Sequence, residues 1–116
     1  MEPPRVALLD LGATQKYVLI TLSRPSLPDE VYLRGAASAE YHADVRAEFE
    51  PTLLSFGGPG ARVSCPGGGR ITFTAPSTYR VHGYSMAFGK ADHAASAKLL
   101  QAHLPQATIT FDDEGY

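Results

Sequence analysis

The residues best suited to chemistry stand in the run Glu40-Tyr41-His42-Ala43-Asp44, where a histidine lies near the start of an amphipathic segment. The free N–H groups and the positive dipole end of a helix N-terminus favour phosphate. The same dipole disfavours imidazolium, so His42 there rests neutral, as a general base must. A second run, residues 83–89 (Gly-Tyr-Ser-Met-Ala-Phe-Gly), is typical of a loop that brings backbone donors close to a ligand. Together the two runs suggest a small site that handles phosphate.

Cys65 and Arg70 suggest a different chemistry, that of a cysteine phosphatase with a thiolate and an arginine in one phosphate loop. The chain has four residues between them, one fewer than that signature needs. Arg70 also does not begin a helical pattern, so nothing in the pattern lowers the pKa of the thiol. The sequence therefore favours a half-buried strand cysteine over a nucleophile.

The four histidines are His42, His82, His93 and His103, and they do not have the spacing of metal ligands. The chain has neither a His-Glu-x-x-His motif nor a cysteine pair, which argues against a zinc site. We expect no metal and no cofactor. We place His82 in a strand, and His93 and His103 on the solvent face of a helix.

Three cations, Lys16, Arg34 and Arg70, stand beside predicted strands, where a side chain can converge on a phosphate. Ordinary solvated charge remains the alternative for each of them taken singly.

The composition indicates one globular domain over residues 1–116, with 44% hydrophobic and 19% charged residues. A formal net charge of −2 gives no basic surface for nucleic acid. No apolar run approaches the roughly 20 residues that cross a bilayer. The lone Cys65 and the absence of a signal-peptide pattern predict a cytoplasmic protein, and we expect a monomer.

The elements that must position these residues follow from periodicity and turn signals. One helix should begin at the N-cap Ser38 and run through Glu50, with Pro51 ending or kinking it, and another should run from the cap Asp92 to His103. Residues 66–70 join two strand-like runs, and Gly67-Gly68-Gly69 is either a hairpin turn or a close approach to a ligand. The predicted strands are 6–11, 16–22, 31–35, 61–65, 71–74, 79–85 and 107–111. This order predicts an α/β fold, a mixed sheet of about six strands packed with two helices.

Six motifs, in this order, resemble the phosphohistidine phosphatase (Janus/Ocnus) family. They are Lys16-Tyr17-Val18-Leu19-Ile20, Arg34-Gly35, the run from Ala39 to Asp44, the run from Gly67 to Ile71, Val81 with residues 83–89, and Gly115-Tyr116. The resemblance covers the chain from about Lys16 to its end. It implies a small α/β domain that hydrolyses phosphoramidate bonds, chiefly those of phosphohistidine on proteins, without a metal.

The resemblance also implies roles for individual residues. His42 falls on the family's proton acceptor. Phosphate contacts fall on Lys16, Ser85, Met86 and Ala87, while Tyr41 and Ala43 flank the phosphate, and Arg34 and Arg70 shape the site electrostatically. Two alternatives stay open: a non-catalytic module that binds a phosphorylated partner, and a phosphatase acting mainly on phospholysine or small phosphoramidates.

Overall fold

The computed structural model describes residues 2–8, 14–36 and 41–113, and in these it contains six strands and two helices. The strands are β1 (Val6–Leu8), β2 (Gln15–Ser23), β3 (Glu30–Ala36), β4 (Arg62–Ala75), β5 (Thr78–His82) and β6 (Thr108–Phe111). The helices are α1 (His42–Gly57) and α2 (His93–His103). The predicted α/β fold with a mixed sheet and two helices is confirmed.

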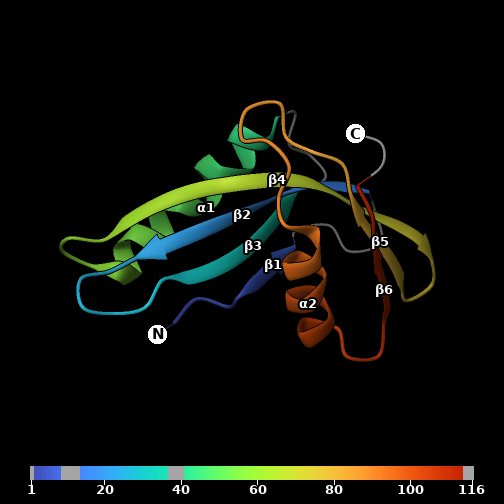
Figure 1. Cartoon of the computed structure of the whole chain (residues 1–116). Helices are drawn as coiled ribbons and strands as arrows, with labels where there is room; N and C mark the ends of the chain where they lie inside the picture. The colour runs from blue at the N-terminus through green and yellow to red at the C-terminus, as the bar shows by residue number, and fades with distance from the viewer. Residues whose placement is uncertain (1, 9–13, 37–40, 114–116) are drawn as a thin grey trace.

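The strands form one sheet in the order β1-β3-β2-β4-β5-β6 (Figure 1). The two outermost pairs, β1 with β3 and β5 with β6, are parallel, and the three central pairs are antiparallel. The two helices cover opposite faces of the sheet, α1 over β2, β3 and β4, and α2 nearer to β5 and β6.

The alternation of β2 divides the core between the two faces. Val18, Ile20 and Leu22 are fully buried in the cluster that packs against α1, whereas Tyr17 and Leu19 belong to the cluster that packs against α2. Side chains of successive strand residues point to opposite faces. A strand with both sets buried is central, and β2 accordingly pairs with β3 on one side and β4 on the other.

Of the two outcomes expected at Pro51, a helix end or a kink, the end is wrong, because α1 continues through Pro51 to Gly57. An internal proline removes one helical hydrogen bond and costs about 3 kcal/mol. Beyond it, Leu53 is fully buried and Phe56 packs against the same core cluster. We infer that this burial offsets the cost of the proline. The predicted N-cap Ser38 lies outside the described residues, and α1 begins at His42 with Tyr41 as its N-cap.

The hairpin expected at Gly67-Gly68-Gly69 is also wrong, since residues 62–75 form the single strand β4. These glycines pair with Leu19, Val18 and Tyr17 of β2. Their absent side chains allow other parts of the chain to come close: a Cβ on Gly67 would lie 2.7 Å from the Cα of Ala91. The close approach at these glycines is made by the chain itself, and the approach to a ligand that the sequence suggested stays a prediction.

Candidate functional site

His42 is the first residue of α1 and is buried, with 3% of its surface exposed. Its Nε2 lies 2.8 Å from the carbonyl oxygen of Gly69. A carbonyl oxygen can only accept, so Nε2 carries the hydrogen and donates it. In the neutral ring the lone pair is then on Nδ1, which is the nitrogen able to take up a proton.

The surroundings of His42 favour its neutral form. Burial lowers the pKa of His42, the hydrogen bond to the Gly69 carbonyl raises it, and the charges of Lys16 and Arg70 lower it further. The sequence anticipated a neutral histidine from the helix dipole; in the structure burial is the largest cause of the lowered pKa.

Lys16 and Arg70 are direct cross-strand partners on β2 and β4. Like charges placed opposite each other in a sheet are unfavourable unless something compensates them. Both also act electrostatically on His42, so two positive charges and a neutral imidazole come together at one end of the sheet.

The loop that follows β5 is braced by its own hydrogen bonds. Ser85 and Gly89 exchange two backbone hydrogen bonds of 3.0 and 2.9 Å. The buried Ser85 hydroxyl oxygen accepts the N–H groups of Ala87 at 3.2 Å and Phe88 at 3.0 Å. The first role of the Ser85 side chain in this structure is therefore to fix the shape of the loop.

The same loop is attached to β4 beside His42. The Gly68 N–H donates to the Gly89 carbonyl at 3.0 Å, and the Ala91 N–H donates to the Gly68 carbonyl at 3.1 Å. A Cβ on Gly68 would lie 2.9 Å from Cδ2 of His42 and 3.3 Å from Cβ of Ser85. Only a residue without a side chain lets the histidine and the loop both reach β4 here.

His93 contradicts its expected place on a solvent face: it is buried, with 3% of its surface exposed, whereas His103 is exposed as predicted. Nε2 of His93 lies 2.7 Å from the Gly83 carbonyl oxygen and Nδ1 lies 2.6 Å from the Tyr17 hydroxyl. It thus holds the residue at which the loop begins. The spacing of the buried residues of α2 carried the missed signal, since they are His93, Ser96, Ala97 and Leu100.

The end of α1 and the loop enclose a cavity of about 210 Å³, and Figure 1 places these two segments side by side at the top of the molecule. Its lining residues are Tyr41, His42, Ala43, Asp44, Met86 and Ala87. Five of the predicted site residues are therefore brought together, with Lys16 and Arg70 near the histidine and Ser85 within the loop.

Arg34 was also predicted as a site residue, but its contacts lie elsewhere in the structure. It is buried, and its guanidinium donates to the carbonyls of Leu33 and Pro4 at 3.0 and 2.7 Å. It also lies over the rings of Tyr32 and Phe49, at 5.2 and 5.5 Å from their centroids. It does not line the cavity beside His42, so its contacts in this structure are those of a residue that joins the N-terminal segment to the sheet.

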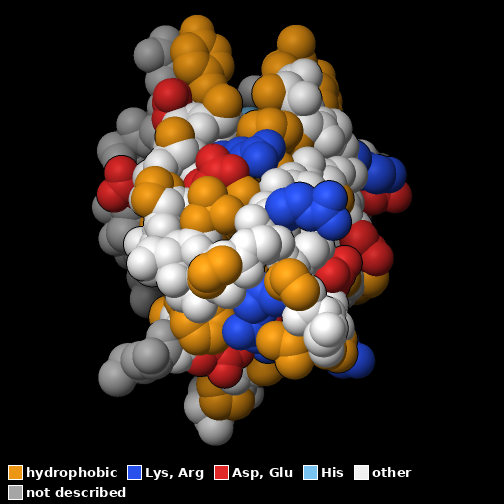
Figure 2. Space-filling model, turned by 90° about the vertical axis from the view of Figure 1, so that its left-hand side faces the viewer, with side chains coloured by type: hydrophobic (Ala, Val, Ile, Leu, Met, Phe, Trp, Pro, Cys, Tyr) orange, Lys and Arg blue, Asp and Glu red, His pale blue; other side chains and the backbone are white. Residues whose placement is uncertain are grey.

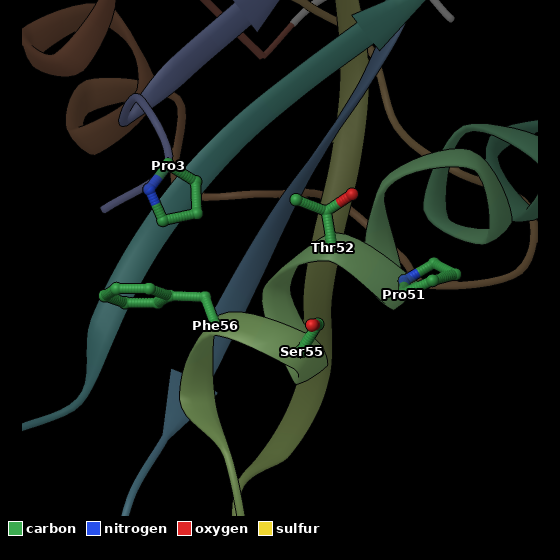
Figure 3. Close-up of a pocket in the computed structure, with 5 residues that line it drawn as sticks. All are labelled: Pro3, Pro51, Thr52, Ser55 and Phe56. Atoms are coloured by element: carbon green, nitrogen blue, oxygen red, sulfur yellow. The ribbon is translucent and has the colours of Figure 1, made fainter. Parts of the chain in front are cut away.

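A larger hollow of about 630 Å³ lies elsewhere on α1, as Figure 3 shows. It is lined by Pro3, Pro51, Thr52, Ser55 and Phe56, among which there is no ionisable side chain. Size alone would select this hollow, but a reaction needs groups that hold or move charge. The smaller cavity at His42 is the one equipped for chemistry.

Cys65, a metal site and a membrane span were the other possibilities raised by the sequence. Burial raises the pKa of the half-buried Cys65 thiol to about 11, which supports the structural interpretation of this cysteine. Among residues 2–8, 14–36 and 41–113, no three His, Cys, Asp or Glu side chains group together as metal ligands. Neither of the described helices is long and apolar enough to span a membrane.

Fold and site together define a small α/β protein with a neutral histidine and a braced loop around one cavity, and with two cations that act electrostatically on that histidine. Residues 3–108 match the model of the Janus/Ocnus family, and the chain belongs to that family. It is 41% identical over 102 residues to the sex-regulated protein janus-A of Drosophila melanogaster, an alignment covering 87% of this chain and 73% of the relative. It is 34% identical over 115 residues to the 14 kDa phosphohistidine phosphatase of Sus scrofa, covering 93% and 89%. The resemblance seen in the sequence motifs is confirmed.

Proposed function

We propose that this protein is a phosphohistidine phosphatase, hydrolysing the P–N bond of histidine-phosphorylated proteins without a metal. The observation that carries the proposal is His42: its Nε2 is committed to the Gly69 carbonyl, and its lowered pKa leaves Nδ1 free of a proton at neutral pH. A neutral nitrogen beside two cations is suited to accept a proton while an anion reacts nearby. The similarity to the pig phosphohistidine phosphatase supports the same activity.

In the proposed reaction a water attacks phosphorus and loses its proton to Nδ1 of His42. The P–N bond breaks, and the leaving nitrogen of the substrate takes up a proton. Phosphoryl transfer of this kind mainly requires positioning and charge stabilisation. Lys16 and Arg70 supply positive charge, and Ala43, in the first turn of α1, offers a backbone N–H that the helix itself leaves unused.

A second mechanism uses the same nitrogen as a nucleophile. Nδ1 of His42 would attack phosphorus, the substrate nitrogen would leave, and water would then hydrolyse the phosphorylated His42. The two mechanisms differ in whether a phosphorylated enzyme forms, and this difference can be measured.

The proposed function is tested by phosphate release from a histidine-phosphorylated peptide, with phosphoserine and phosphotyrosine peptides as controls. We expect release from phosphohistidine alone, undiminished after exhaustive chelation. Loss of activity on chelation, with recovery on adding one metal, would contradict metal independence. Tight binding of the peptide without any release would instead identify a non-catalytic binding module, and faster release from phospholysine would identify the other alternative.

A further inference from the structure

The side chain of Tyr41 does not cap helix α1, although Tyr41 is at the N-cap position. It is the N-cap of α1, a position that favours Ser, Thr, Asp or Asn, and its side chain makes no capping hydrogen bond to the described part of α1. Its backbone is nevertheless fixed, because its N–H donates to Oδ2 of Asp44 at 2.9 Å and its carbonyl accepts the Asp44 N–H at 3.0 Å. The result is a ring that is 61% exposed on a well-held backbone.

Met86 is a second large apolar side chain that is exposed to solvent. It is 78% exposed, although it belongs to the loop that Ser85 and Gly89 brace by backbone hydrogen bonds. Figure 2 shows hydrophobic side chains projecting on both sides of a notch at the top of the molecule. This is the end at which Figure 1 places the start of α1 and the loop after β5. Exposed apolar side chains around a cavity are typical of a binding site.

Both side chains line the cavity of about 210 Å³ that also holds His42. Of the lining residues His42 is buried, whereas Tyr41 and Met86 are exposed apolar side chains. Lys16 and Arg70 act electrostatically on His42 from outside the lining, which also includes the carboxylate of Asp44. The volume is below the roughly 300 Å³ at which pockets for drug-sized ligands begin. The cavity therefore suits a phosphoryl group joined directly to one small ring.

We propose that Tyr41 and Met86 form a clamp that binds the imidazole ring of phosphohistidine while its phosphoryl group lies at His42. This proposal rests on the proposed function and names the specificity-determining residues of its site. In phosphohistidine the ring is bonded to phosphorus, so it must lie next to the cavity mouth. A tyrosine ring and a thioether both make favourable contacts with an aromatic ring. Phospholysine places a flexible chain there, which gains less from stacking.

The test compares selectivity rather than activity. The kcat/KM values of the wild type, Tyr41→Ser, Tyr41→Phe and Met86→Ala are measured on a phosphohistidine peptide and on phosphoramidate, which carries no ring. We expect the phosphohistidine-to-phosphoramidate ratio to fall about threefold to tenfold in Tyr41→Ser and Met86→Ala, the range that one or two aromatic contacts supply. Tyr41→Phe should keep the ratio, since it keeps the ring.

Two features make the outcome decisive. Serine is a good N-cap, so Tyr41→Ser should melt no lower than the wild type, and a lost ratio cannot then be ascribed to unfolding. The control is Phe111→Ala, which removes an aromatic ring that is 52% exposed on β6 and should leave the ratio unchanged. An equal loss on both substrates, or no loss, overturns the clamp.

The failure of the proposed function would look different. If the wild type hydrolyses neither substrate, the proposed function is wrong, and the clamp is tested by calorimetric affinities for the phosphohistidine peptide and inorganic phosphate. The ratio of these affinities should fall in Tyr41→Ser and Met86→Ala if the clamp is correct. An unchanged ratio overturns it without reference to turnover.

Discussion

His42 and His93 lie on opposite faces of β4, against neighbouring glycines of that strand. A Cβ on Gly68 would lie 2.9 Å from His42, and a Cβ on Gly69 would lie 2.6 Å from His93. The first histidine donates to the Gly69 carbonyl and the second donates to the Gly83 carbonyl, where the loop begins. One stretch of strand thus sets the position of the candidate proton acceptor and of the loop opposite it.

The first prediction is that Gly68→Ala lowers activity at least tenfold while the protein still folds. The added methyl group would lie 2.6 Å from the backbone carbonyl oxygen of Tyr17, 2.9 Å from His42 and 3.3 Å from Ser85, so β2, the histidine or the loop must shift. Overpacking of this kind costs about 1–3 kcal/mol of unfolding free energy. Turnover and urea denaturation measure the two effects. Ser64→Ala, an exposed change on the same strand, is the control and should alter neither.

Turnover in Gly68→Ala equal to that of the wild type would mean that His42 and the loop tolerate a shift at β4. The steric account of this glycine would then be wrong.

Local signals predicted much of the fold. Asp92 was expected to cap a helix, and its side chain accepts the Ala95 N–H at 3.1 Å. The strand expected over residues 16–22 was also identified correctly, as β2. Periodicity and capping are properties of neighbouring residues, so the sequence displays them directly.

The incorrect predictions have a common physical cause: contacts between residues that are far apart in the sequence determine these features. Pro51 breaks a helix locally, but burial of residues beyond it keeps α1 intact. Gly67-Gly68-Gly69 resemble a turn in the sequence because the reason for the glycines lies elsewhere: His42 at the start of α1, and Ala91 and His93 at the start of α2, come close to them. Likewise, no neighbour in the sequence indicates that His93 meets Tyr17 and Gly83. The resemblance to the family supplied the candidate site residues, while their contacts required the structure.

The second prediction concerns pH. The folded protein lowers the pKa of His42 below 6.5, chiefly by burial, so the unfolded chain binds this proton more readily. The contribution of His42 to stability is therefore complete above pH 6.5 and is lost as the pH falls through 6.5 toward the folded pKa. Free enzyme also needs neutral His42, so kcat/KM should fall only below pH 6.5, with its midpoint at the folded pKa.

Profiles of kcat/KM against pH and of unfolding midpoint against pH test this prediction. His42→Ala provides the control, because it should flatten this part of the stability profile. A kcat/KM midpoint above pH 6.5 would show that His42 is not the neutral, buried group described here.

The third prediction is that Lys16→Ala mainly weakens substrate capture. Lys16 is paired with Arg70 across the sheet and acts electrostatically on His42. Removing one charged contact to a phosphate costs about 1.5–3 kcal/mol, roughly a tenfold to hundredfold rise in KM or in the dissociation constant of phosphate. The control is Lys98→Ala, which removes the same charge from α2, away from the cavity at His42. If Lys16→Ala and Lys98→Ala had equal effects, Lys16 would act only through the overall charge of the protein and not through a contact with phosphate.

The fourth prediction separates the two mechanisms at His42. His42→Ala should lower the rate about 10²–10⁴-fold while phosphate still binds, because Lys16, Arg70 and the backbone of the loop remain in place. The lost donor to the Gly69 carbonyl should also cost about 1–3 kcal/mol of stability, measured by urea denaturation. His103→Ala, on the exposed end of α2, is the control and should change neither quantity.

Rapid quenching of the wild type during turnover, under alkaline conditions that preserve phosphohistidine, then distinguishes a base from a nucleophile. Because Nε2 is committed to Gly69, a phosphorylated enzyme would carry its phosphoryl group on Nδ1 of His42. An intact mass one phosphoryl group heavier, forming and decaying at the turnover rate, assigns the nucleophilic role. Turnover without such a species assigns the general base. Near-normal turnover in His42→Ala would exclude both roles and with them the proposed mechanism.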